Sequence, residues 1–456
     1  MSEDVTLDAF VNGSGSNVSR DNLMTSLDET SVGNIPSDWS AVRLAELTKD
    51  TLYGANESAE DYDPNRPRYI RIKDIDERGR LKESDKASLS PDKAEGYLLE
   101  KGDMLFARSG SPGRTYLHRH NTGEYCYGGY SIKHELISEG LNQEYLSQYT
   151  KSQKYWNWIK RIARTGAQAN INSGEYASLL VPLPSLPEQR KIATVLYTVD
   201  QAIAKTEEVI EQKERVRTGF MQDIFTGSGT ESTKPVRLSA VDTEIPEHWE
   251  VKAVGKVSTQ ITDGAHLTPD RSEDGYLLLS ARNVKNGFLD LSDVDYVPKE
   301  EYKRLIEKCN PEPGNILISC SGTIGRVCEV PDNLDFALVR SAALVKFDNS
   351  ILSNYAEKVL QSIGVQKQMM GYQTQSAQPN LFQGQIASLE IPIPPMEEQR
   401  IIAERLENVG ESINADKKYK SQLKRLKTGL MQDLISGTVR TTNTNIQVPG
   451  KVAQHG

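Results

Sequence analysis

Two short loops in this chain of 456 residues combine a Ser-Gly turn with a Gly-Arg pair. The first loop, residues 107–114, reads Ala-Arg-Ser-Gly-Ser-Pro-Gly-Arg, and its counterpart at 319–326 reads Ser-Cys-Ser-Gly-Thr-Ile-Gly-Arg. Such a loop presents backbone amides and a guanidinium together, which suits a phosphate group. A plain β-turn with a solvent-exposed arginine explains the same residues equally well.

A second pair of segments places an amide side chain two residues before another. Residues 165–171 contain Gln168 and Asn170, and the matching segment 375–381 contains Gln378 and Asn380. Amides at this spacing on a loop can read adenine edges, or they can hold the loop in shape through local hydrogen bonds. The structural role is favoured, and the reading role stays open.

The sequence contains no recognisable catalytic constellation. The phosphate-binding P-loop, the Gly-x-Ser-x-Gly nucleophile elbow, the His-Glu-x-x-His zinc motif and the kinase signatures are all missing. The four cysteines, at positions 126, 309, 320 and 328, form no Cys-x-x-Cys pair and are expected to be free thiols in a reducing compartment. We therefore expect no enzyme activity, no metal site and no cofactor site in this chain.

The composition predicts a soluble, cytoplasmic protein. Only 37% of the residues are hydrophobic, no apolar run approaches the ~18 residues of a spanning helix, and the N-terminus lacks the order of a secretory signal. A net charge of −9 taken alone argues against nucleic acid as a partner. Local basic runs, such as the one over residues 66–73, are hidden by that total.

The sequence also repeats itself at an offset of 210 residues. Three groups of residues return: Ile35-Pro36 with Trp39 at 245–249, 182–190 at 392–400, and 218–223 at 428–433. A common offset in three places indicates a tandem duplication of one unit.

Each half of the repeat ends in a predicted long helix, over residues 185–227 and 395–437. In the first, Ser185 and Glu188 have the spacing of a capping box, and apolar residues follow in steps of four and three. The stripe of the first helix consists of Ile192, Leu196, Val199, Ile203, Thr206 and Ile210, and continues less cleanly to Val216 and Phe220. The stripe of the second helix consists of Ile402, Leu406, Val409, Ile413, Leu423, Leu426 and Leu430. About 40 residues would make each helix ~60 Å long. We expect the two stripes to pack on each other in antiparallel fashion, with Asp416 and Lys420 weakening the middle.

The expected fold class is α+β with an internal tandem repeat and pseudo-twofold symmetry. Two mixed α/β domains are separated by the two long helices, which pair as an antiparallel coiled coil. The expected divisions are a flexible tail at 1–34, domains at 35–184 and 245–394, helices at 185–227 and 395–437, a linker at 228–244 and a flexible tail at 438–456.

The doubled set of motifs resembles the specificity (S) subunit of type I restriction-modification systems. The residues that carry the resemblance are Pro-x-Pro, then Glu-Gln-Arg-x-Ile-Ala opening a long helix, then Thr-Gly-x-Met-Gln-Asp and a closing glycine, each present twice between residues 35 and 437. Residues 263–269 also resemble a segment common near the start of target-recognition domains in this family.

The resemblance implies a non-catalytic subunit that recognises double-stranded DNA. Its two target-recognition domains would each read one half of a bipartite sequence, and the helices would set the spacing between the halves. Two methyltransferase (modification) subunits would dock on it, and restriction (translocase-nuclease) subunits would join them. S-adenosylmethionine, ATP and Mg²⁺ would then belong to these partners.

The resemblance turns the shared loop residues into candidates for DNA contact. They are Arg108, Ser109, Gly110, Gly113, Arg114, Gln168 and Asn170 in the first half, and Ser321, Gly322, Gly325, Arg326, Gln378 and Asn380 in the second. Cys320 stands where the first half has Arg108, so the two loops differ at that position. The rival interpretations are a methyltransferase or nuclease with disguised motifs, and a non-catalytic scaffold whose mixed domains bind protein. Neither the target bases, the spacer, the methylated base nor the presence of a restriction subunit can be derived from the sequence.

Overall fold

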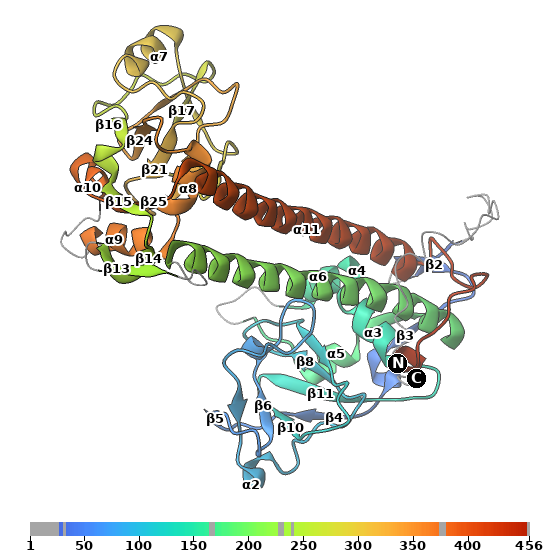
Figure 1. Cartoon of the computed structure of the whole chain (residues 1–456). Coiled ribbons are helices and arrows are strands. Elements are labelled where there is room, and N and C mark those ends of the chain that lie inside the picture. The colour runs from blue at the N-terminus through green and yellow to red at the C-terminus, as the bar shows by residue number, and fades with distance from the viewer. Residues whose placement is uncertain are drawn as a thin grey trace. The chain divides into compact units, whose positions relative to one another are not determined.

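The computed structural model describes residues 27–30, 33–163, 169–226, 232–238, 241–373 and 380–453. The chain forms two compact units, which we call unit 1 (residues 1–207 and 419–456) and unit 2 (residues 208–418). Each unit is described by itself, with the elements labelled in Figure 1. No described helix has an apolar stretch long enough to cross a membrane.

Unit 1 contains a mixed domain, the first part of one long helix and the last part of the other. Its strands are β1 (Leu27–Thr30), β2 (Gly33–Pro36), β3 (Ser40–Arg43), β4 (Thr48–Tyr53), β5 (Glu60–Asp61), β6 (Arg68–Ile70), β7 (Ala87–Ser88), β8 (Met104–Ala107), β9 (Thr115–Leu117), β10 (Tyr125–Tyr127), β11 (Ser131–Leu136) and β12 (Leu180–Leu183). Its helices are η2 (Leu44–Leu47), η3 (Ile72–Asp74), α2 (Pro91–Ala94), α3 (Gln143–Tyr149), α4 (Gln153–Ile162), α5 (Ser173–Ala177), the start of α6 (Leu186–Thr226), the end of α11 (Met396–Ser436) and α12 (Gly450–Ala453).

Unit 2 repeats this plan with the roles of the two long helices exchanged. Its strands are β13 (Thr233–Leu238), β14 (Val241–Pro246), β15 (Glu250–Ala253), β16 (Ser258–Asp263), β17 (Tyr276–Leu279), β18 (Val284–Lys285), β19 (Phe288–Leu289), β20 (Asp295–Val297), β21 (Ile316–Ser319), β22 (Val327–Glu329), β23 (Phe336–Leu338), β24 (Ala342–Phe347) and β25 (Glu390–Ile393). Its helices are η4 (Val254–Lys256), α7 (Lys299–Ile306), α8 (Ser353–Leu360), α9 (Ile363–Gln373) and α10 (Gln383–Ala387), beside the end of α6 and the start of α11.

A four-stranded antiparallel sheet lies at the centre of each domain. Its strand order is β4-β11-β8-β9 in unit 1 and β16-β24-β21-β22 in unit 2. The register is also the same, because Ile132 faces Phe106 in one sheet and Ala343 faces Ile318 in the other. The predicted α+β fold with an internal repeat is therefore confirmed.

One inner strand of each sheet, β8 or β21, is buried along its whole length because both of its faces are covered. In β8, Met104 and Phe106 enter the core cluster that includes the helices, while Leu105 enters a cluster on the opposite face. In β21, Ile316 and Ile318 lie in the helical core, and Leu317 lies in the other cluster. Alternate residues of a strand point to opposite faces, so a doubly covered strand needs apolar residues at every position.

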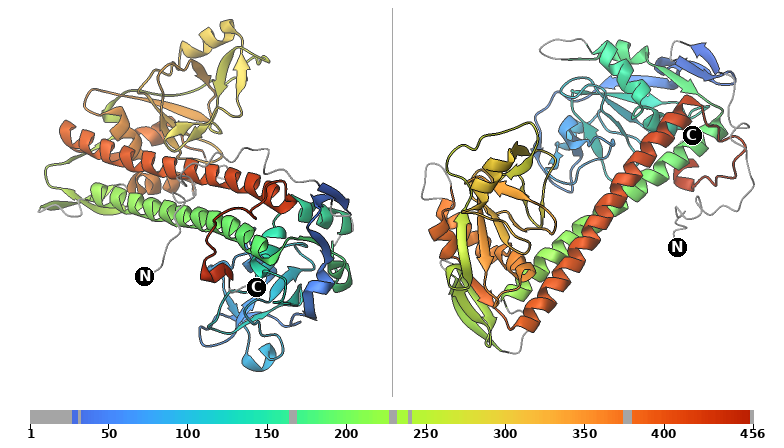
Figure 2. Two further views of the ribbon diagram at one scale, coloured as in Figure 1. Left: turned by 90° about the vertical axis from the view of Figure 1, so that its right-hand side faces the viewer. Right: turned by 90° about the horizontal axis from the view of Figure 1, so that it is seen from above.

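The two long helices are confirmed almost to the residue, as α6 (Leu186–Thr226) and α11 (Met396–Ser436). They run antiparallel where they meet in unit 1, since Asp200 binds Lys427 and Glu207 lies 3.9 Å from Lys420. The views in Figure 2 agree with this pairing in unit 1. In unit 2, Lys213 donates to Asp416 at 2.6 Å, so the polar positions expected to weaken the seam are ion-paired.

The two stripes pack on each other over only part of their length. Ile192 and Leu196 are buried in the core of the unit 1 domain, whereas Val199, Ile203 and Leu423 form a separate helix–helix cluster. Val216 and Leu426, also assigned to the stripes, are 64% and 44% exposed. A helix that passes from a domain surface to a two-helix seam changes the face that it buries, so one heptad pattern does not describe it.

The repeated sequence motifs hold each helix to its own domain. The indole of Trp39 donates to Glu188, and that of Trp249 donates to Glu398. The amide of Gln189 binds the backbone of residues 140, 142 and 184, as the matching amide at 399 does for residues 350, 352 and 394. Glu188, expected in a capping box, is thus engaged by Trp39 instead.

The expectation of a flexible C-terminal tail was wrong for residues 438–453. Val452 is 1% exposed and packs in the core of unit 1, and its carbonyl accepts from the Asn142 side chain. Lys191 donates to three backbone carbonyls of this segment. Apolar residues spaced through a polar segment, here Val439, Ile446, Val448 and Val452, find partners only in the folded unit.

Two other segments also differ from expectation. Residues 228–244, expected as a linker, include most of a hairpin in which β13 pairs with β14. In the expected N-terminal tail, β1 pairs with β2 in the same way. These strands belong to the repeat and precede each domain in the chain, so the repeated unit begins earlier than residues 35 and 245.

Candidate nucleic-acid interface

The two Ser-Gly loops have the same backbone frame in both units. Each follows the buried strand of the central sheet, β8 or β21. Four backbone hydrogen bonds are shared. In unit 1 they run from Ala107 N to Arg114 O, Gly113 N to Ala107 O, Arg108 N to Tyr130 O and Ile171 N to Arg108 O. In unit 2 the matching bonds run from Ser319 N to Arg326 O, Gly325 N to Ser319 O, Cys320 N to Ser341 O and Leu381 N to Cys320 O. Isolated bridges join Ser109 to Asn170 and Ser321 to Asn380. The structure therefore brings each predicted loop together with its predicted asparagine.

The side chains on this frame differ sharply between the units. In unit 1, the guanidinium carbon of Arg108 lies 4.8 Å from the ring centre of Tyr53, and its Nε donates to Asn170 Oδ1 at 3.3 Å. The Tyr53 hydroxyl donates to Ser173 Oγ and accepts from the Ser173 amide, both at 3.1 Å. These hydrogen bonds with Ser173, and then the nearby Arg108 charge, lower the pKa of Tyr53.

Unit 2 carries a single acidic residue, Asp263, at the matching place. Cys320, which replaces Arg108, is 5% exposed, and burial raises its pKa to about 12. Asp263 replaces Tyr53 at the end of β16, where it binds the Gln383 side chain and lies 3.1 Å from His266. Unit 1 thus has the Arg108 guanidinium on the Tyr53 ring at this place, whereas unit 2 has the Asp263 carboxylate.

The glycines of the loops have two different roles. Gly110 and Gly322 have φ of +77° and +72° with nothing near an added Cβ, so they form open turns that favour glycine only through their backbone. Gly113 and Gly325 are closely packed, because a Cβ there would lie 2.9 Å from Ile159 or Gln366. The second glycine of each loop thus serves packing.

The two arginines that close the loops are not equivalent. Arg114 donates to the carbonyl of Ile75 at 2.9 Å and lies 3.4 Å from that of Ile72, so it ties the loop to η3. Arg326 makes no hydrogen bond or ion pair with any described residue through its side chain. The predicted phosphate role therefore fits Arg326 better than Arg114. Gln168 and Gln378 lie outside the described residues.

The sequence interpretation missed Tyr53, Ser173 and Gln383, and it noted Asp263 only as the first residue of the segment 263–269. They lie far from the loops along the chain, on β4 and α5 in unit 1 and on β16 and α10 in unit 2. The 210-residue offset relates Tyr53 to Asp263 and Ser173 to Gln383, so the repeat could have paired them. Only the sheet and the short helix show that they surround the loops.

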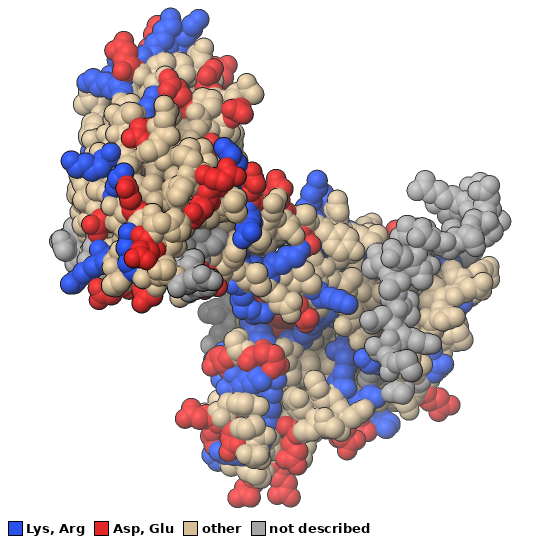
Figure 3. All heavy atoms as spheres, viewed as in Figure 1, with Lys and Arg blue, Asp and Glu red and all other residues tan. Residues whose placement is uncertain are grey.

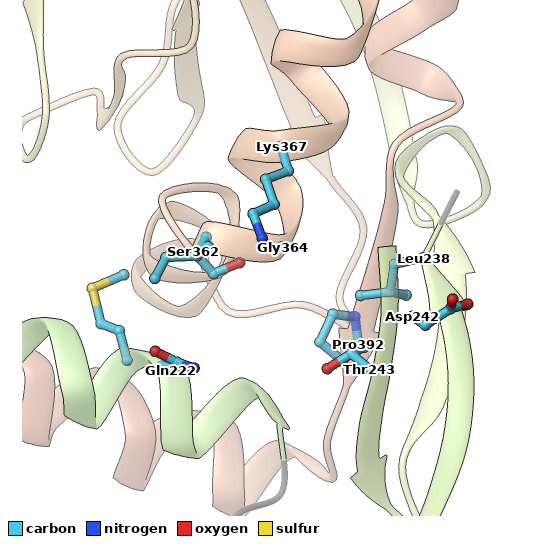
Figure 4. Close-up of a pocket in the computed structure, with 10 residues that line it drawn as sticks. Gln222, Leu238, Asp242, Thr243, Ser362, Gly364, Lys367 and Pro392 are labelled. Carbon is cyan, nitrogen blue, oxygen red and sulfur yellow. The ribbon is translucent and has the colours of Figure 1, made fainter. Parts of the chain in front are cut away.

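Each unit contains a cavity that can be compared with its loop. The cavity of unit 1, about 330 Å³, is lined by Gly113, Arg114, Lys151 and Trp156 among others, and burial lowers the pKa of Lys151 to about 8. The cavity of unit 2, about 380 Å³, lies between α9 and the β13–β14 hairpin, with Lys367 and Asp242 as its charged residues (Figure 4). It shares no residue with the second loop, so we do not assign it to the interface.

Charges are mixed on the surface, and no metal-binding cluster occurs among the described residues. Basic and acidic side chains are intermingled on the face drawn in Figure 3, although the total charge is −9.

Across the described ranges, no group of three or more His, Cys, Asp or Glu side chains could hold a metal. All four cysteines are buried free thiols, as predicted.

Comparisons with known proteins agree with the repeat. The family model for the type I restriction modification DNA specificity domain matches residues 36–214 and again 246–425. The type I restriction enzyme MjaVIII specificity subunit of Methanocaldococcus jannaschii is 23% identical over 432 residues, which cover 90% of this chain and 95% of that protein. The Escherichia coli EcoKI specificity subunit is 25% identical over 311 residues, covering 64% of this chain and 63% of its own.

A solved structure supports the same fold. The S subunit of a type I restriction-modification system from M. genitalium aligns with a TM-score of 0.57 at 17% identity, over 87% of this chain and 96% of its own. The two matches to the family model take in most of the chain. The protein therefore belongs to the family of type I restriction-modification DNA specificity subunits, with two copies of the specificity domain.

Proposed function

We propose that this chain reads a bipartite double-stranded DNA target, with one half-site read by each unit. The observation that carries the proposal is the conserved backbone frame of the two loops with different side chains, Arg108 and Tyr53 against Cys320 and Asp263. A duplicated scaffold with unlike contact residues is suited to reading two unlike sequences. Neither unit needs chemistry of its own for this role.

The same proposal assigns the chemical reactions to partner subunits. Two methyltransferase subunits would dock on the chain and bind S-adenosylmethionine, and restriction subunits would bring ATP and Mg²⁺. Because the chain is built from two similar units, it offers similar surfaces twice, which supports two copies of the same partner. The antiparallel helices would hold the half-sites at a fixed separation.

The deciding experiment is to map methylated bases in the host genome with the gene intact and with the gene deleted. We expect deletion to abolish methylation at one bipartite motif and to leave other motifs unchanged. An unchanged methylation map would contradict the proposal and would favour a protein-binding scaffold. The purified chain alone, given labelled S-adenosylmethionine and DNA, should transfer no methyl group, and transfer would favour a disguised methyltransferase.

A deletion within the helices tests the spacing role separately. Removing one helical turn from α6 should change the spacer between the half-sites, because helix length sets the separation of the reading surfaces. The half-site sequences should stay as they are. A changed half-site with an unchanged spacer would contradict the role of the helices.

A further inference from the structure

We propose that Arg108 of unit 1 reads a guanine through the two acceptors on its major-groove edge, and that Tyr53 and Asn170 hold the arginine in position. This inference rests on the proposed function and adds the chemical identity of one recognised base. It also implies that the two half-sites are read by different chemistry.

The Arg108 guanidinium is held on two sides. The Tyr53 ring lies beneath it at 4.8 Å, and Asn170 Oδ1 accepts from Nε. Neither Nη1 nor Nη2 makes a hydrogen bond to any residue in the described ranges. The two terminal nitrogens thus form a fixed fork of donors, which matches a pair of acceptors better than a single one.

The tyrosine beneath the arginine is itself fixed by rigid elements. Tyr53 ends β4, where it pairs with Ile132 of β11, and its hydroxyl makes two hydrogen bonds to Ser173 at the start of α5. A reading group held by strands and a helix keeps its geometry better than one held by a loop alone. Tyr53 is therefore a positioning residue for Arg108.

The partner chemistry follows from the donors. Among the base pairs, guanine presents two adjacent acceptors, O6 and N7, in the major groove, and the bidentate contact of arginine with these atoms is the commonest specific one. A phosphate could also accept both donors. The choice between guanine and phosphate depends on the second unit.

Unit 2 argues against the phosphate. Every half-site has the same backbone phosphates, so a loop position that binds phosphate should carry a cation in both units. The backbone bonds of the loop are kept, yet Cys320 is buried and Asp263 replaces Tyr53. A side chain that changes while its frame is retained has the behaviour of a base-reading residue, not of a phosphate clamp.

The first experiment uses the wild-type chain in complex with its modification subunits. Each guanine of the target duplex is replaced in turn by 7-deazaguanine, which lacks the N7 acceptor, and binding is measured at fixed salt. We expect one position in one half-site at which affinity falls by about 5- to 150-fold, the range of a good bidentate contact. A target that tolerates 7-deazaguanine at every position of both half-sites would overturn the inference.

The second experiment assigns that position to Arg108. The R108A complex should bind the unmodified target more weakly and should lose nothing further from 7-deazaguanine at the sensitive position. Methylation maps of cells with R108A or R108Q should show one relaxed or altered base in one half-site. The C320A variant is the matched control in unit 2, and its methylated motif should stay unchanged.

The alternative outcomes are distinct. If Arg108 binds phosphate, R108A weakens all sequences alike, lowers the salt dependence by about one counterion and leaves the motif intact, which would overturn the inference. A wild-type complex without any preferred sequence would remove the proposed function and the inference together. A bipartite motif that tolerates 7-deazaguanine throughout would remove the inference alone. The wild-type duplex scan remains decisive even if R108A fails to fold.

Discussion

Units 1 and 2 attach a long helix to a domain through the same tryptophan–glutamate contact but complete it differently. In unit 1, Arg440 donates to both oxygens of Glu188 and to Asp38, and Glu188 has a side-chain exposure of 1%. In unit 2, His248 lies 2.7 Å from Glu398, and both side chains are well exposed. The comparison teaches that duplicated contacts diverge in energy once one copy is buried and the other is not.

The difference arises from the segments that follow the two long helices. Arg440 follows α11 in a segment that folds back on unit 1, where Val452 is buried. In unit 2 the segment that follows α6 continues into the β13–β14 hairpin. The end of α11 is therefore followed by a segment that packs over Glu188 in unit 1. The end of α6 is followed by the start of the next domain in unit 2.

Removing the buried cation should have the largest effect. We expect Arg440→Ala to lower the free energy of unfolding of unit 1 by about 3–5 kcal/mol, because it leaves Glu188 buried without a compensating charge. Urea unfolding monitored by hydrogen exchange in peptides of each unit would measure the loss. The matched change His248→Ala should cost less than about 1 kcal/mol in unit 2, as expected for an exposed pair. Equal losses in the two units would contradict the comparison.

The seam between the helices offers a second test of the same asymmetry. Leu423 is 2% exposed and packs with Val199 and Ile203 in unit 1. Lys213, the residue that the repeat places opposite it in the alignment, binds Asp416 and Ser412 in unit 2 and stays partly exposed.

We expect Leu423→Ala to cost about 3 kcal/mol, from lost burial and the cavity it leaves, and Lys213→Ala less than about 1 kcal/mol. Thermal unfolding of both variants beside the wild type would check the ranking. If Lys213→Ala proved the more damaging change, the seam would depend on its ion pair and not on apolar packing.

A smaller difference should appear with pH. His134 of β11 is 1% exposed, and burial lowers its pKa from 6.5 to about 4, while unit 2 has Val345 at the matching position of β24. Because the unfolded chain binds the proton more readily, this histidine stabilises unit 1 fully above pH 6.5 and progressively less as the pH falls towards 4.

We expect a loss of about 2 kcal/mol from His134 between pH 7 and pH 5. His134→Val, the residue of unit 2, should reduce the acid sensitivity of unit 1 when unfolding is measured across that range. His118, whose pKa burial also lowers to about 4, would retain part of it. An identical pH profile in the variant would show that His134 does not titrate on unfolding.

The helices were predictable because their signals are local. The apolar spacing and the glycines that follow each helix are read along a single stretch of chain, and the bounds Leu186–Thr226 and Met396–Ser436 agree with them. Packing of the C-terminal segment was missed because Arg440 and Val452 find their partners some 250 to 310 residues away. No local pattern reports such a contact.

The candidate site was predictable only in part. Arg108 and Asn170 were identified from the sequence, and the structure brings them within hydrogen-bonding distance. Arg114 was grouped with them, yet its guanidinium binds backbone carbonyls. The sequence shows that an arginine is present in a particular motif. The partner of its side chain depends on the groups that the fold places beside it.

The sequence by itself determined the duplication, the two long helices and the membership of a family that recognises DNA. Those features follow from repeated residues and from periodic burial, which act over short stretches of chain. Only the tertiary structure decided that Glu188 is buried under Arg440 while Glu398 is exposed, and that Arg108 lies on Tyr53 while Cys320, at the matching place, is buried. These differences depend on contacts between distant segments, and their free energies depend on how completely folding removes each group from water.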